Sequence, residues 1–131
     1  MLLSQASALT VTPLLNAVQA TNTASATSGT GNWLDVRTYD GEIAVLVNVG
    51  VVTSGSMAPK LQSATDANGG GAADITGATG STVTTGTTAS SAQCIVVDPK
   101  KVVGGFLGFV GTVTSGSMAI SVVAAGKKKY V

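Results

Sequence analysis

The chain has 131 residues, a length that suits a single domain with one hydrophobic core. Only 10% of the residues are charged, against about 25% in an ordinary soluble domain, and the formal net charge is +1. This composition excludes the broad basic surface that nucleic-acid binding requires and favours a protein that packs against other molecules, because little electrostatic repulsion keeps its copies apart.

The first segment, residues 1–28, is predicted to be an extended N-terminal arm in which residues 9–12 could form a strand. Its apolar side chains are spaced too irregularly for an amphipathic helix, and Pro13 would interrupt one. No basic residue precedes the apolar stretch, so we expect no cleaved signal peptide. We expect the apolar side chains of the arm to lie on a neighbouring subunit, and they are Leu2, Leu3, Leu9, Val11, Leu14, Leu15 and Val18.

Beyond the arm, residues 29–131 are assigned to one β-sandwich domain, because apolar and polar side chains alternate there. The odd-numbered residues from Ile43 to Val49 are all β-branched, and Ala44 and Leu46 make the opposite face apolar too, as in a strand covered on both sides. Residues 118–125 show the same design. Further strands are predicted at residues 33–39, 60–65, 81–87, 92–97 and 105–113. Seven or eight short strands favour an antiparallel β-sandwich that is jelly-roll-like.

The heptapeptide VTSGSMA occurs twice, at residues 52–58 and 113–119. Each copy follows a strand rich in Gly and Val and precedes an alternating strand, so we interpret each as the tip of a β-hairpin. Gly55 and Gly116 would supply the positive φ that such tips often require, and the flanking serines would bond the turn backbone. A paired ligand loop is the functional alternative.

The residue types that carry most enzyme chemistry are scarce. The chain has no histidine, and its single cysteine, Cys94, lies in an apolar strand where we expect a buried structural thiol. The six acidic residues are dispersed, mostly at strand ends and turns, where they would bond the backbone. We therefore predict that the protein is not an enzyme and needs no cofactor.

One short segment, residues 66–70, resembles the oxygen-ligand spacing of a calcium loop. The position where such a loop would need an acidic ligand is Gly77, so we interpret the segment as a surface hairpin loop and predict no metal site. The most apolar run, residues 102–113, is broken by four glycines and is shorter than a membrane-spanning helix, so we expect no membrane association.

Several segments carry a resemblance when they are taken in order. They are WLDVRTYDGEIAV at residues 33–45, KLQS at 60–63, VDPKK at 97–101 and VVAAGKKKY at 122–130. This pattern resembles a group of small virion structural proteins of tailed bacteriophages, and the resemblance covers roughly residues 33–131. Where that group typically has a longer polar hairpin with an aromatic residue, this chain has Gly69, Gly70 and Gly71.

The resemblance implies a β-sandwich that decorates or cements the exterior of a capsid, as a dimer or trimer at symmetry axes. The implied partners are the major capsid protein and other copies of the chain, and the implied location is the virion surface, after synthesis in the host cytoplasm. The alternatives are a tail-tube or neck subunit and a carbohydrate-binding β-sandwich module.

The C-terminal tail is the second predicted interface, formed by Lys127, Lys128, Lys129 and Tyr130. Three adjacent lysines are too few for tight nucleic-acid binding at physiological salt, so we expect them to contact an acidic protein surface.

Overall fold

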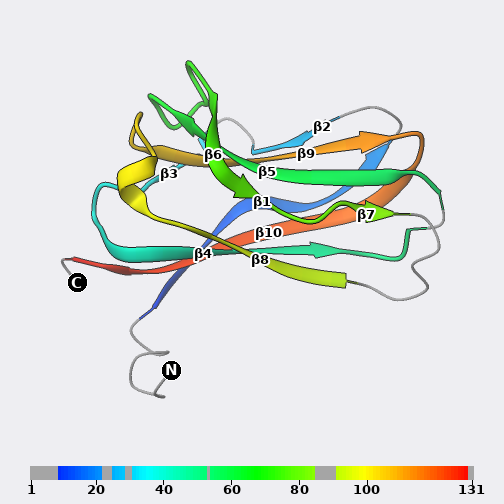
Figure 1. The fold of residues 1–131 in the computed structure, drawn as a ribbon, viewed down its shortest axis with the longest axis horizontal. Coiled ribbons are helices and arrows are strands. Elements are labelled where there is room, and N and C mark those ends of the chain that lie inside the picture. Colours follow the sequence, from blue (N-terminus) through cyan, green and yellow to red (C-terminus); the bar gives the residue numbers. More distant parts are fainter. Residues whose placement is uncertain (1–8, 22–24, 29–30, 53, 85–90, 130–131) are drawn as a thin grey trace.

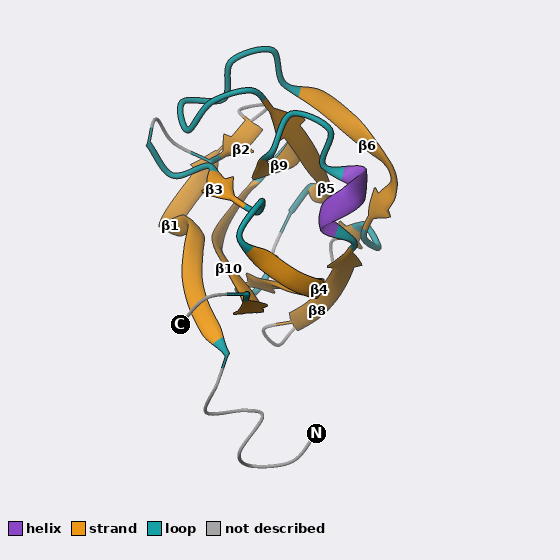
Figure 2. Ribbon diagram, turned by 90° about the vertical axis from the view of Figure 1, so that its left-hand side faces the viewer, coloured by secondary structure: helices purple, strands orange, loops and turns teal. Residues whose placement is uncertain are grey.

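The structure, a computed structural model, describes residues 9–21, 25–28, 31–52, 54–84 and 91–129. Two antiparallel sheets pack face to face (Figure 1, Figure 2). The first sheet contains, in spatial order, β1 (Thr10–Thr21), β10 (Ser117–Lys128), β4 (Tyr39–Val49) and β8 (Ser91–Val97). The second sheet contains β2 (Ser25–Thr27), β9 (Phe106–Thr114), β5 (Ser56–Ala64) and β6 (Ala73–Thr79), with the short β3 (Leu34–Asp35) on β9 and β7 (Val83–Thr84) on β5; the 3-10 turn η1 (Pro99–Lys101) follows β8.

The strand order is that of a jelly roll. The strands pair from the ends of the chain inward: β1 with β10, β2 with β9, β4 with β8 and, innermost, the consecutive strands β5 and β6. The two halves of this folded ribbon then join through the β10–β4 and β9–β5 pairs. All of these pairs are antiparallel, and a ribbon wrapped in this way gives the two four-stranded layers of a jelly roll. The predicted all-β antiparallel sandwich is confirmed.

The core lies between the two sheets and is built by the predicted alternation. The odd-numbered residues of β4 from Ile43 to Val49 are buried against side chains such as Leu61 of β5 and Phe109 of β9. The opposite face of β4 differs from the expectation. Leu46 is 40% exposed, because among the described residues no third layer covers the first sheet.

Residues 10–21 are part of the sandwich, so the predicted arm is wrong for this segment. They form β1, which pairs with β10 at the edge of the first sheet. Leu14 and Leu15 are 0% and 9% exposed, and both belong to the chain's own core. Register shifts after Pro13 and again after Leu15 break the regular alternation, which is why no period is visible in the sequence. Pro13 is tolerated because β1 is an edge strand.

The two copies of VTSGSMA lie side by side, although neither is the tip of a paired hairpin. One copy joins β4 to β5 and the other joins β9 to β10, and each connection crosses from one sheet to the other. Gly55 has a positive φ of 79°, but the second copy has its positive φ of 56° at Ser115 instead of Gly116. Gly116 meets a different requirement, because a Cβ there would overlap the carbonyl oxygen of Ser54.

Two further segments differ from the prediction. Residues 73–79 form β6, a strand that is absent from the strands predicted from the sequence. The strand predicted at residues 33–39 shrinks to β3, because the chain then turns, with the Tyr39 N–H donating to the Val36 carbonyl. The Trp33 ring turns into the molecule, where its indole nitrogen donates to the Ser28 carbonyl. Gly108 leaves the space that this ring fills, since a Cβ at that position would overlap it.

Candidate assembly surface

The outer face of the first sheet carries two rows of apolar side chains that run across all four strands. Neighbouring strands in this sheet are paired so that residues opposite one another share a face. The first row is Pro13, Val123, Leu46 and Cys94, and the second row is Val11, Ala125, Ala44 and Val96. We call these eight residues the apolar rows.

The apolar rows are open to solvent in the single chain. Val11 is 62% exposed and Val96 is 52% exposed. Cys94 is also exposed, which corrects the expectation of a buried thiol: Ile95 and Val97 are the inward residues of β8, and strict alternation turns Cys94 outward. A sheet face of this kind, apolar and uncharged, is typical of a surface that another molecule covers.

The rows are flanked by smaller groups along the same face. Ser121 of β10 lies opposite Asn48 of β4, which lies opposite Ala92 of β8. A shallow groove of about 250 Å³ runs over this row, and its lining includes Gly50 and Ala119. The face therefore combines an apolar centre with small polar side chains toward the end of the sandwich where β4 ends.

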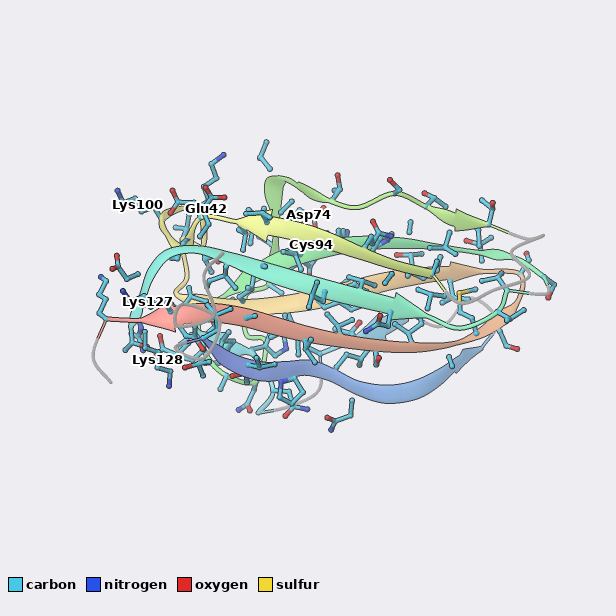
Figure 3. The ribbon with its side chains drawn as sticks, turned by 90° about the horizontal axis from the view of Figure 1, so that it is seen from below. Glu42, Asp74, Cys94, Lys100, Lys127 and Lys128 are labelled. Atoms are coloured by element: carbon cyan, nitrogen blue, oxygen red, sulfur yellow. The ribbon has the colours of Figure 1, made fainter. Side chains whose placement is uncertain are left out.

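Charged side chains border the rows at the other end only. Lys127 of β10 lies opposite Asp40 of β4. Figure 3 shows Lys127, Lys128, Glu42 and Lys100 gathered toward this one end of the sandwich. The candidate surface is thus an uncharged sheet face that ends at a charged border.

The structure places the predicted tail residues at this border. Lys127 is exposed, whereas Lys128 is half-buried with its amine 6.0 Å from the centre of the Tyr39 ring. Lys129 is exposed, and its backbone N–H donates to the carbonyl of Thr38. Tyr130 lies outside the described residues. The lysines therefore extend from a strand end that is fixed to the sandwich, and they point in more than one direction.

The predicted arm residues separate into several groups. Val11 belongs to the apolar rows, Leu9 is half-buried, and Leu14 and Leu15 are in the core. The backbone of Val18 pairs with Ile120 of β10, but its side chain is outside the description, as are Leu2 and Leu3 altogether. Of the seven side chains, the described part of the chain shows only Val11 clearly available to a neighbour.

Several acidic side chains have structural partners. Both oxygens of Asp35 accept hydrogen bonds from the Arg37 guanidinium, and these bonds lower the pKa of the carboxyl group. Asp66 Oδ1 accepts from the backbone N–H groups of Gly70 and Asn68, which lowers its pKa and closes the β5–β6 loop. Asp74 accepts from Gln62 and Lys60, with the same effect on its pKa.

No group of three potential metal-ligating side chains gathers within the ranges that the structure covers. The segment at residues 66–70 is a loop closed by its own carboxylate, in agreement with its interpretation as a hairpin loop. In the same ranges, none of the helical segments has the length and hydropathy needed to cross a membrane.

The fold defines the protein as a jelly-roll β-sandwich, and a chain of one solved virus particle shares this fold. A chain of the T13 particle of infectious bursal disease virus matches 92% of this chain with a TM-score of 0.58 and 9% sequence identity. Chains of the Gx and Gt strains of that virus match with TM-scores of 0.49 and 0.47, each at 14% identity, over 89% and 92% of this chain.

This chain spans only 31% to 33% of the length of those viral chains. At such low identity, the T13 match shows a common fold and nothing more specific. No model of a known protein family matches the sequence, and a comparison with curated proteins finds no relative.

Proposed function

We propose that the protein is a structural subunit of a virion, a decoration or cement protein that binds the exterior of a tailed-bacteriophage head. The observation that carries the proposal is the pair of exposed apolar rows on a jelly-roll sandwich. The likeness to a chain of a virus particle supports a capsid role, and the sequence resemblance supports the decoration role more specifically.

The apolar rows would seat the subunit on the major capsid protein. Their half-exposed Val and Leu side chains would each contribute about 1 kcal/mol when a partner removes the remaining exposed area from water. Association and side-chain ordering offset part of this gain, so the contact needs most of the rows to be covered. Lys127 and Lys129, at the border of the face, would meet acidic groups of the capsid and add a salt-sensitive contribution.

A carbohydrate-binding module is less well supported. Such modules present exposed aromatic rings as platforms for sugars. Trp33, Tyr39 and Phe109 are all buried, and Phe106 is half-buried with the Arg37 guanidinium 5.2 Å from its ring centre. The aromatic side chains in the described ranges therefore serve packing.

The direct test is to image virions that contain the protein by electron cryomicroscopy. Density for a jelly roll on the outside of the head would support the proposal, and density confined to the tail or neck would overturn it in favour of the alternative virion role.

A binding assay tests the surface itself. We expect Leu46→Glu to reduce co-sedimentation with heads that lack the protein by about tenfold or more, because the contact would bury an unpaired carboxylate. The control is Thr76→Glu, which places the same charge at an exposed position of β6 in the second sheet. Repeating the assay at high salt measures the lysine contribution. Equal binding by both variants would exclude the apolar rows as the seat.

A further inference from the structure

The charged side chains avoid one end of the sandwich completely. The chain has seven basic and six acidic residues, and all thirteen fall in the described ranges. Four long stretches carry no charge: residues 1–34, which precede the first charged residue, and residues 43–59, 75–97 and 102–126. These stretches include strand residues on both sides of four connections: β1 to β2, β4 to β5, β7 to β8 and β9 to β10.

The jelly-roll order brings the strand ends that flank these four connections to the same end of the sandwich. Strand pairing places Thr21 opposite Ser117, Val49 opposite Ser91, and Ser56 opposite both Thr114 and Thr84. This is the right-hand end in Figure 1, remote from the C-terminus. We call it the charge-free end, and its described residues are 21, 49–52, 54–56, 84, 91 and 114–117.

In its described residues, the surface of the charge-free end consists of small polar groups around the apolar side chain of Val51. Ser54, Thr114 and Ser117 are exposed, and Val51 is 47% exposed. The tip is also held together closely. The backbones at Gly55 and Gly116 approach so nearly that a Cβ on either would overlap the other connection. This closely packed surface is uncharged, so it lacks the electrostatic repulsion that normally opposes association.

Rotational symmetry explains why such an end would exclude charge of either sign. Around a rotation axis, a side chain near the axis faces its own copies, so any charge meets the same charge. At a separation of about 4 Å and an effective dielectric constant of about 20, that repulsion is on the order of 4 kcal/mol. Hydroxyl groups carry no such penalty, because each one can both donate and accept a hydrogen bond to its copy.

We propose that copies of this chain meet one another at the charge-free end, around a rotation axis. A different partner with a charged surface would favour complementary charges at the contact, and none of the thirteen lies there. The thirteen charges then lie away from the axis, on the outward parts of the oligomer. This inference rests on the distribution of charge and holds whether or not the oligomer sits on a phage head.

The test places a charge of each sign at the exposed Ser54. Ser54→Lys and Ser54→Glu are both expected to weaken self-association, by about tenfold or more in Kd, because each copy then meets its own charge. An equal mixture of the two variants should recover association, since Lys and Glu can face each other. A contact with a different partner of fixed charge would be weakened by one sign and strengthened by the other.

Native mass spectrometry over a range of concentrations, with no capsid present, measures the oligomer. The matched controls are Thr38→Lys and Thr38→Glu, exposed at the opposite end, which should associate as the unaltered chain does. Thermal melting verifies that every variant is folded. The proposal is overturned if the unaltered chain is a monomer at every concentration, if neither Ser54 variant weakens association, or if the effect depends on the sign of the charge.

Discussion

Several glycines are required in this protein because a side chain at their position would overlap neighbouring atoms. Gly116 and Gly55 allow two connections from different parts of the chain to touch, and Gly108 makes room for the Trp33 ring. The two connections that contain VTSGSMA pack on each other, so the two copies of the heptapeptide meet similar steric limits. Its two glycines are nevertheless not equivalent, since only Gly55 has a positive φ.

This close approach predicts a large effect for a small change. Gly116→Ala is expected to destabilise the fold by about 1–3 kcal/mol, because the new methyl group must displace the backbone at Ser54. The control is Gly50→Ala, whose Cβ would lie 3.5 Å from that of Ala119, an ordinary contact at a φ that alanine tolerates. Denaturant unfolding of both variants measures the difference, and equal stabilities would show that the two connections do not touch.

At the scale of elements, β1 matters most for how the sandwich is completed. It pairs with β10 along nearly the whole of that strand and contributes Leu14 and Leu15 to the core. Its outward Val11 belongs to the apolar rows. One strand therefore serves the fold with one face and the candidate assembly surface with the other.

This division within β1 gives a second prediction. Leu14→Ala is expected to cost about 2–5 kcal/mol of unfolding free energy, because the side chain is 0% exposed. Val11→Ala, on the exposed face of the same strand, should change stability by about 0.5 kcal/mol or less. If chemical denaturation gave similar small losses for both variants, residues 10–21 would not be part of the core in solution.

At the scale of the whole molecule, charge is arranged along the long axis of the sandwich. The charged end holds the Arg37–Asp35 ion pair, and Lys127 lies opposite Asp40 on paired strands there, whereas the charge-free end holds none of the thirteen charged side chains. Contacts made at the charged end would therefore be sensitive to salt, whereas contacts made at the charge-free end would not.

The carboxyl groups of the chain determine how its stability should depend on pH. The pKa values of Asp35, Asp66 and Asp74 are lowered in the folded chain, so their bonds stabilise it above the unfolded pKa of about 3.9 and lose that effect as pH falls through the lower folded values. The chain has no histidine, the side chain that ordinarily titrates between about pH 5 and pH 8. We expect a constant melting temperature over that interval and a decline below about pH 4. Calorimetric scans that showed a decline near neutral pH would contradict this assignment.

The local features of the protein follow from short stretches of its sequence. Alternation predicted the strands β4, β8, β9 and β10, because the side chains of a strand point alternately to its two faces. Of the six acidic residues expected mostly at strand ends and turns, Asp66 and Asp98 lie in loops and the other four lie in strands. Where bulges or glycines disturb alternation, as in β1 and β6, the same reasoning failed.

Only the tertiary structure decided which segments become neighbours. The alternation around Leu46 and Cys94 cannot reveal which face another layer covers, and the spacing of charges cannot reveal that strand ends from four uncharged stretches lie at one end of the sandwich. Both features depend on pairing between strands such as β1 and β10, which are separated by most of the chain. Such pairing is selected by burial of the whole core, a property of the folded chain that no short stretch of sequence contains.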